Sequence, residues 1–188
     1  MGMEPDQVAR FEQLFAAHYG DLMRFATRRV GADAAGDVVS STFLVAWRRL
    51  ADVPADRSRA WLFGTARRVI ANELRGRERR ERLGRRVAAH VDVAADDHAG
   101  PVTEQLRVRA VLGELPPGDQ ELLRLTEWDG LDIDQVAAVL GCSPAAVKVR
   151  LHRARRRFAN RLAAADRADE AVGRTVRPIR LPEGNATS

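Results

Sequence analysis

Hydrophobic residues recur at helical spacing through most of the chain, and no stretch shows the strict alternation that marks a β-strand. In the first half, this pattern predicts a helix over 4–30 that ends at Gly31, a second helix over 33–50 and a third that starts near Ser58. The third helix passes from aromatic residues into a strongly charged run. We therefore expect an all-α fold, with a first small helical domain over 4–86.

A change in composition separates this domain from the rest of the chain. Residues 87–104 contain no lysine or arginine, and acidic residues lie among alanines beside a Gly-Pro break. We expect them to form a flexible linker to a second small helical domain over 105–163. Beyond Leu162 the helical periodicity is lost, so residues 164–188 are expected to be a mobile tail.

The clearest pattern in the second domain is two helices joined by a tight turn. Asp132 can cap the first helix, with Gln135 three residues later as a variant of the capping box, and Gly141 ends it. Ser143 followed by Pro144 is a strong start signal for the next helix. The serine hydroxyl can accept from a backbone N–H of the first turn, and proline lacks the backbone N–H that would have no partner at the first helical position. This order of signals predicts a helix-turn-helix.

The second of these helices has two different faces. One buried stripe is predicted by apolar residues at helical spacing, namely Val147, Leu151, Ala154 and Phe158. The opposite stripe begins with small residues, which let a helix enter the major groove of DNA, and ends with basic ones. No acidic residue occurs between Ser143 and Ala165. The candidate DNA contacts are Ser143, Ala146, Lys148, Val149, Arg150, His152, Arg153 and Arg156.

Within this helix, base readout and phosphate binding are expected at different places. Lys148, Val149, His152 and Arg153 lie nearer the end that enters the groove, whereas the arginines at 155–157 lie a turn further on, where the helix meets phosphates. An ordinary solvated basic face is the alternative interpretation. Such faces usually interleave glutamate with arginine, which favours DNA binding here.

Composition supports an anionic partner and limits the other possibilities. The 188 residues are 45% hydrophobic and carry a formal net charge of +5, which suits a folded protein that binds an acidic partner. Lys148 is the sole lysine, so 30 of the 31 basic residues are arginine. This bias is best explained by a GC-rich coding sequence and carries little weight by itself. The single cysteine, Cys142, excludes an internal disulfide and a cysteine-cluster metal site, and it fits a reducing cytoplasm.

The sequence offers neither a membrane segment nor catalytic chemistry. No apolar run has membrane-spanning length and the N-terminus lacks a signal-peptide profile, so we expect a cytoplasmic protein without membrane insertion. The four histidines are scattered, and no glycine-rich phosphate loop or Ser-His-Asp pattern is present. We expect no enzyme activity, no cofactor and no metal site.

Four blocks of sequence follow one another in a distinctive order. They are DVVSSTFLVAWRRL at 37–50, AWLFGTARRVIAN at 60–72, LGELPP at 112–117 and GLDIDQVAAVLGCSPAAVKVRLHRAR at 130–155. Together they resemble the bacterial extracytoplasmic-function sigma factors, which keep only the second and fourth conserved regions of larger sigma factors. The resemblance covers nearly everything from Phe11 to Leu162. It implies a protein that binds core RNA polymerase and directs it to promoter DNA, and many relatives are held inactive by an anti-sigma protein.

The resemblance also implies a polymerase-docking surface on the second helix. The matching residues are Asp37, Leu44, Trp47 and Arg48. The family usually has glutamine at the position of Ser40 and often an acid at that of Ser41, so the polar contacts of this surface are expected to be weaker or differently made. Core packing is an equally good interpretation of Trp47.

A second DNA contact is implied where the third helix begins, at the part that reads and opens the start-proximal promoter element. Melting requires an unstacked base to be held, which suits polar edges beside aromatic or guanidinium planes. The matching residues are Arg57, Ser58, Arg59, Arg68, Asn72 and Arg75. Trp61 and Phe63 could stack on bases, although a core position is favoured for Trp61.

Two other functions remain open at this point. A simple helix-turn-helix regulator would use the N-terminal helices for dimerization or ligand binding. A DNA recombinase would need a strand-rich catalytic domain, and the helical pattern of the first half argues against it.

Overall fold

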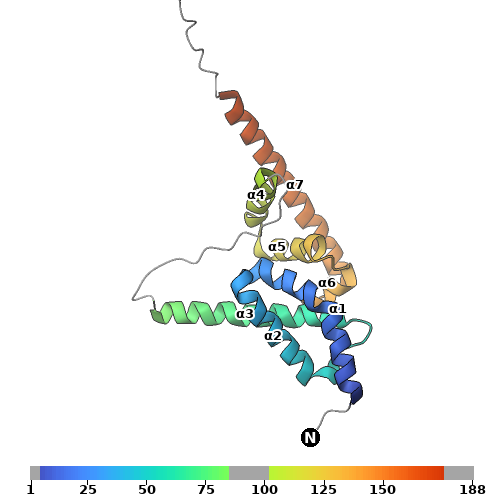
Figure 1. Cartoon of the computed structure of the whole chain (residues 1–188). Helices are drawn as coiled ribbons and strands as arrows, with labels where there is room; N and C mark the ends of the chain where they lie inside the picture. Colours follow the sequence, from blue (N-terminus) through green and yellow to red (C-terminus); the bar gives the residue numbers. More distant parts are fainter. Residues whose placement is uncertain (1–4, 85–101, 176–188) are drawn as a thin grey trace, which may run out of the picture.

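The structure is a computed structural model that describes residues 5–84 and 102–175, and every element within these two ranges is helical (Figure 1). The first half contains α1 (Pro5–Val30), α2 (Ala32–Arg48), the short 3-10 helix η1 (Leu50–Asp52) and α3 (Ser58–Gly84). Gly31 separates α1 from α2 with a positive φ of 81°, a conformation that glycine adopts without strain. The all-α prediction is confirmed.

The helices of the first half pack around a shared apolar core. Leu22 and Phe25 from α1 are fully buried, and so is Leu62 from α3. The Phe25 ring meets the Phe63 ring edge-on, with centroids 4.8 Å apart. Each large side chain buried in this way contributes about 1.5–3 kcal/mol to folding. This core fixes the start of α3 and the loop before it against α1.

The second half contains α4 (Val102–Gly113), α5 (Pro117–Leu123), the π-helical turn η2 (Arg124–Trp128), α6 (Ile133–Leu140) and α7 (Pro144–Thr175). Helix α4 begins at Val102, inside the range predicted for the linker. The remaining predicted linker residues lie outside the described residues, as do residues 176–188.

Helix α7 continues to Thr175, well past Leu162, where the sequence pattern predicted that helical periodicity ends. Alanines at 163–165 favour a helix without giving it an apolar face. The Asp166 carboxylate forms an ion pair with the Arg107 guanidinium of α4, with the nearest atoms 2.6 Å apart. The long helix seen in Figure 1 therefore rests on helix propensity and on a long-range ion pair rather than on periodicity.

The two halves are packed against each other. Helix α6 lies along α3, and Val136 and Val139 of α6 belong to the same buried apolar cluster as Leu62 and Phe63 of α3. A Cβ added at Gly64 would lie 3.8 Å from the Cα of Val139, an ordinary van der Waals distance, so α3 and α6 are in contact at this position. The structure thus contains the two predicted helical units and, in addition, an apolar contact between them.

Candidate nucleic-acid interface

The turn between α6 and α7 has the geometry that the sequence signals predict. The Asp132 carboxylate accepts a hydrogen bond of 2.8 Å from the Gln135 backbone N–H, and the Gln135 side chain accepts one of 3.1 Å from the Asp132 N–H. Gly141 has a left-handed conformation with φ 67°, and the Ser143 hydroxyl oxygen accepts 3.2 Å from the Ala146 N–H. The capping box, the glycine stop and the serine cap are all confirmed.

Helix α7 presents the two predicted faces. Val147, Leu151 and Ala154 are buried and Phe158 is half-buried. The candidate DNA contacts are exposed, apart from the half-buried Ala146, and they are Ser143, Lys148, Val149, Arg150, His152, Arg153 and Arg156. Val149 is an exposed apolar residue in the middle of this stripe, with 52% of its surface accessible. An exposed apolar side chain beside cations suits contact with a thymine methyl group.

Ion pairs distinguish the arginines of α7 from one another. Arg155 donates to Glu127 at 2.7 Å, Arg161 donates to Glu114 at 2.8 Å, and Arg157 pairs with Asp119. Within the described ranges, by contrast, Lys148 and the arginines at 150, 153 and 156 have no carboxylate partner. Arg155 and Arg157 therefore join α7 to η2 and α5, and their predicted role in phosphate binding stays a prediction.

The loop before α3 is tied to α1 at two points. The Arg10 guanidinium donates to the Val53 carbonyl at 2.6 Å, and the His18 Nε2 atom lies 3.0 Å from the Ser58 hydroxyl. Burial lowers the pKa of His18; nearby Asp21 opposes this change and Arg59 adds to it. The Ser58 hydroxyl can donate to this ring nitrogen or accept from it, depending on the tautomer of His18. The two contacts hold the loop in place beside the first turn of α3.

The residues predicted to contact the start-proximal promoter element differ in their exposure and in their contacts within the protein. Arg57 is exposed and pairs with its neighbour Asp56 at 3.1 Å. Arg68, Asn72 and Arg75 are exposed on one face of α3, where the Asn72 side-chain oxygen accepts from Arg75. Ser58 is half-buried against His18, as described above.

Three residues considered for DNA contact make contacts within the protein. Phe63 is only 1% exposed and packs on Phe25, so base stacking by Phe63 is excluded in this conformation. Trp61 is half-buried against the core, in agreement with the core position favoured for it. Arg59 donates to the backbone carbonyls of Asp129 and Gly130.

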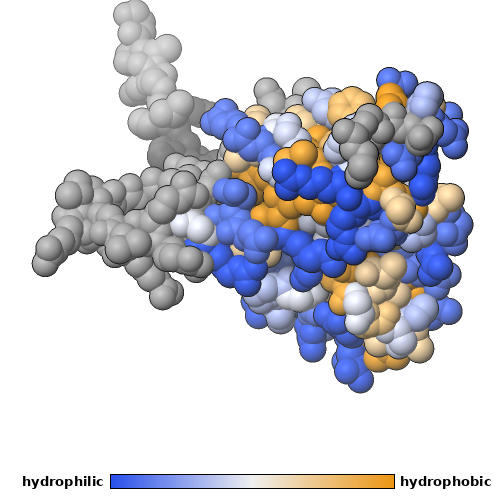
Figure 2. Space-filling view, turned by 90° about the horizontal axis from the view of Figure 1, so that it is seen from below, coloured by the Kyte–Doolittle hydropathy of each residue, from blue (hydrophilic) through white to orange (hydrophobic). Residues whose placement is uncertain are grey.

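The proposed docking face of α2 is exposed and borders an aromatic ridge that sequence reasoning missed. Asp37, Leu44 and Arg48 are exposed, and the half-buried Trp47 packs edge-on against Phe11 with ring centroids 4.7 Å apart. On α1, two further rings are 40% and 43% exposed, namely Phe15 and Tyr19. Figure 2 views the molecule from the side of the first half, where hydrophobic surface lies in patches among hydrophilic side chains.

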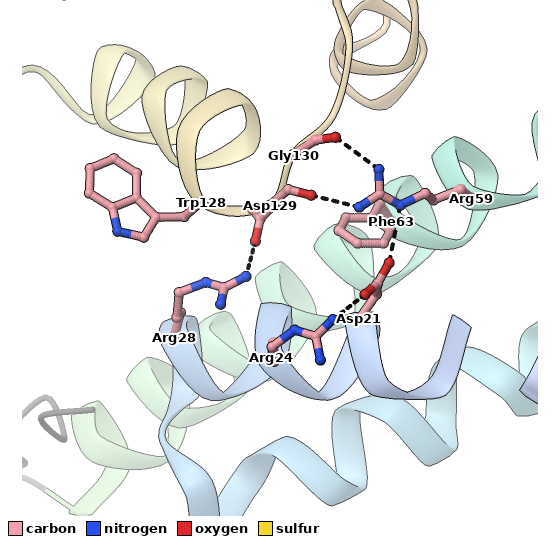
Figure 3. A pocket seen from close by; sticks show the side chains of 8 residues that line it. All are labelled: Asp21, Arg24, Arg28, Arg59, Phe63, Trp128, Asp129 and Gly130. Carbon is pink, nitrogen blue, oxygen red and sulfur yellow. Dashed lines mark hydrogen bonds and ion pairs between the residues drawn. The ribbon is translucent and has the colours of Figure 1, made fainter. Parts of the chain in front are cut away.

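Sequence reasoning also missed a charged cluster between the halves. The Asp129 carboxylate, with no exposed surface, accepts from Arg28 and, at 2.9 Å, from Arg29. The residues drawn in Figure 3 line a pocket of about 130 Å³ at this place. In the sequence, Asp129-Gly130 is typical of an ordinary turn, and Arg28 and Arg29 are typical of the basic residues that stabilise the end of a helix. No local signal links these residues, which are about 100 positions apart.

In the part of the chain that the structure describes, no three His, Cys, Asp or Glu residues are grouped to hold a metal ion. The same part contains no helix with the length and hydropathy needed to cross a membrane. A helical fold with an exposed basic stripe on a helix-turn-helix and a second group of exposed polar residues on α3 defines the class of the protein. It is a helical DNA-binding factor.

Comparisons with known proteins identify the family. Residues 14–80 match the family model for Sigma-70 region 2, and residues 105–158 match that for Sigma-70, region 4. The RNA polymerase sigma factor CnrH of Cupriavidus metallidurans is 37% identical over 158 residues, which cover 77% of this chain and 82% of the relative. The ECF RNA polymerase sigma factor SigL of Mycobacterium tuberculosis is 30% identical over 156 residues, which cover 80% and 88%.

Solved structures agree with this result. The sigma factor RpoE in complex with the anti-sigma factor NepR from Bartonella quintana has a TM-score of 0.65 and 25% identity, covering 81% of this chain and 96% of that one. CnrH in complex with the cytosolic domain of CnrY has a TM-score of 0.57 and 33% identity, covering 82% and 88%. The chain belongs to the sigma-70 family, in its extracytoplasmic-function group. It is a sigma factor that directs promoter-specific initiation by RNA polymerase and is not itself an enzyme.

Proposed function

We propose that this sigma factor makes two separate contacts with promoter DNA and that α7 carries the upstream one. The observation that carries this assignment is the exposed stripe of α7, where one lysine and three arginines face solvent without carboxylate partners within the described ranges. Cations without internal partners can release counterions from phosphates and donate to guanine edges. Lys148, Val149, His152 and Arg153 contact bases, while Arg150 and Arg156 contact phosphates; Ser143 and Ala146 lie at the end that enters the groove.

The loop before α3 and the exposed face of α3 form the start-proximal contact. Asn72 offers an amide that can pair with the edge of an unstacked base, and the neighbouring Arg68 and Arg75 supply cations for the phosphates. Arg57, Ser58 and Arg59 lie at the other end of this surface. The contacts of Arg10 and His18 with the loop support this role, because a base-holding loop needs a fixed position.

The exposed face of α2 is the surface that meets polymerase. Asp37, Leu44 and Arg48 combine an acid, an apolar residue and a base on one side of a helix, and the ridge of α1 extends this surface with Phe15 and Tyr19. A central apolar contact with a charged rim is typical of a specific protein interface.

An anti-sigma protein is a further proposed partner. Two sigma factors of similar structure are bound to another protein in their solved structures, and one of those partners is described as an anti-sigma factor. The chain works in the cytoplasm, where its single half-buried cysteine stays reduced.

Reconstituted transcription tests these assignments. The protein is combined with purified bacterial core RNA polymerase on a randomised promoter library, and the starts of the transcripts are mapped. We expect defined start sites with two preferred sequence elements upstream of them. The double variant Lys148→Ala, Arg153→Ala should lose the preference for the upstream element, whereas Arg161→Ala, which removes an arginine already paired with Glu114, should keep it. Loss of the upstream preference in Arg161→Ala as well would contradict the assignment of the stripe.

A further inference from the structure

The pocket at the junction of the two halves is lined mainly by charged side chains and is bordered by one exposed aromatic ring. Its volume is about 130 Å³, and it is partly open to solvent. Arg24 and Arg28 rise from α1 toward residues 128–130 (Figure 3). Arg59 approaches the same residues from α3 and donates to two of their backbone carbonyls. Three guanidinium groups from two helices therefore line one small space.

Positive charge exceeds negative charge around this pocket, because each of three carboxylates is paired with two arginines. The pairs are Asp21 with Arg24 and Arg59, Asp129 with Arg28 and Arg29, and Glu121 with Arg29 and Arg67. A sixth arginine, Arg124, lies in the same field. Burial lowers the pKa of Arg124 and the charge of Arg29 lowers it further, whereas Glu121 and Asp129 oppose this change. A bound anion would balance part of the excess positive charge.

Two arginines of the pocket keep N–H groups for such an anion. The Arg24 side chain is 65% exposed and pairs with Asp21 through its Nη2 atom. The Arg28 side chain is 20% exposed and pairs with Asp129 through its own Nη2 atom. A guanidinium group carries five N–H donors in a planar fork that fits the oxygen atoms of phosphate. The anion that suits this pair of arginines best is therefore a phosphate group.

An exposed tryptophan stands beside these cations. Trp128 is the last residue of η2, borders the pocket and is 43% exposed. Figure 3 shows its indole ring on the side of the pocket where Arg28 lies. The pocket is smaller than the roughly 300–1,000 Å³ of sites that enclose a whole ligand, so a phosphate group fits inside it while the rest of the ligand lies outside. There the indole ring offers a face on which a nucleobase can stack.

We propose that this pocket binds the terminal phosphate groups of a free nucleotide, whose base stacks on Trp128. Arg24 and Arg28 donate to the phosphate oxygens, and the charge of Arg59 adds to the attraction. The buried Phe63 ring and the carboxylates of the pocket leave room for the end of a phosphate chain. The site goes beyond the proposed function, because Arg24, Arg28 and Trp128 are not among the residues assigned to promoter DNA or to polymerase.

Calorimetric titration of the full-length protein with ATP tests the proposal, and adenosine and inorganic triphosphate are the comparison ligands. We expect one saturable site for ATP. Adenosine and triphosphate should each bind about tenfold more weakly or worse, because adenosine lacks the charged hydrogen-bond acceptors and triphosphate lacks the stacking ring. ATP should also quench tryptophan fluorescence in the wild-type protein and quench it much less in Trp128→Phe. Triphosphate binding as tight as that of ATP would overturn the assignment of a nucleotide.

Two exposed side chains can be changed without opening the core. Arg24→Gln and Trp128→Ala should each weaken ATP binding about tenfold, the usual loss for a hydrogen bond to a charged group or for one stacked base. Trp128→Phe keeps a ring and should bind ATP more tightly than Trp128→Ala. Circular dichroism should show unchanged helix content in all three variants.

The matched control is Arg161→Gln, which removes the same charge from an arginine that is 58% exposed and is paired with Glu114 on the other side of the second half of the chain's sequence. This variant should bind ATP as the wild-type protein does. Equal weakening in Arg24→Gln and Arg161→Gln would mean that ATP is held by net charge alone, and the pocket would then be no nucleotide site. A short single-stranded oligonucleotide that displaces ATP and binds more tightly, with the same loss in Trp128→Ala, would likewise overturn the proposal in favour of nucleic acid.

Discussion

Three arginines on α7 allow readout, phosphate binding and internal pairing to be separated within one helix. Arg153 and Arg156 are exposed and, in the described residues, have no carboxylate partner, whereas Arg155 pairs with Glu127 at 2.7 Å. If Arg153 donates to a base edge, Arg153→Ala should cost about 1–3 kcal/mol and relax preference at particular upstream positions. If Arg156 binds only phosphate, Arg156→Ala should weaken all sequences alike and lower the salt slope by about one unit.

The matched control is Arg155→Ala. Its side chain and that of Glu127 are 60% and 44% exposed, so the ion pair is worth only about 0–1 kcal/mol. Because Arg155 already has an anionic partner, its loss should change the salt slope less than the loss of Arg156. Equal reductions of the slope in the two variants would mean that the internal ion pair opens on DNA.

The assay is a promoter library selected with each variant holoenzyme at several salt concentrations. Base preferences are read from the selected sequences, and the salt slope is read from binding curves on one selected promoter. If Arg153→Ala leaves base preferences untouched while Arg156→Ala alters them, the register assigned to α7 in the groove is wrong.

Three further predictions concern other parts of the chain. Asn72→Ala should reduce open-complex formation on duplex promoters and be partly rescued by a pre-melted template, and equal loss on both templates would indicate a folding or docking defect. Burial lowers the pKa of His18 below its ordinary value, so the stability that neutral His18 supports is present above about pH 6.5 and is lost as the pH falls toward the folded-state pKa. His18→Gln should therefore flatten the dependence of the free energy of unfolding in urea on pH in this range. An unchanged pH dependence would mean that another group titrates there. Asp132→Ala removes the cap of α6 and should cost about 0.5–2 kcal/mol in urea unfolding, whereas Asp134→Ala on the same turn, which contributes no cap, should cost less.

The sequence predicted those features whose determinants lie within a few residues of one another. The capping box of Asp132 and Gln135, the stop at Gly141 and the start at Ser143 are local hydrogen-bonding patterns, and each is found in the structure. The buried stripe of α7 was equally readable, because helical periodicity alone places Val147 and Leu151 on one face. Local signals of these two kinds are therefore sufficient to assign the helix-turn-helix.

The contact between the halves could not be predicted in the same way. Arg28 and Arg29 suit the end of any helix, and an Asp-Gly pair suits any turn, so neither element signals that they meet across about 100 residues. The extension of α7 beyond Leu162 has a similar cause, since the pair of Arg107 with Asp166 joins two helices far apart in the chain. Long-range ion pairs have no periodic signature, and sequence patterns report only the faces on which such residues lie.

In a chain with 30 arginines among 31 basic residues, the presence of an arginine carries little information about DNA binding. The position of the nearest carboxylate carries more. Arg155 and Arg157 were predicted to lie where α7 meets phosphates, yet Glu127 and Asp119 reach them from other elements. Arg153 and Arg156 have no such partner in the described parts of the chain, so a phosphate or a base edge meets no internal competitor there. Arg59 differs from both groups, because its partners in the other half are the backbone carbonyls of Asp129 and Gly130 rather than carboxylates.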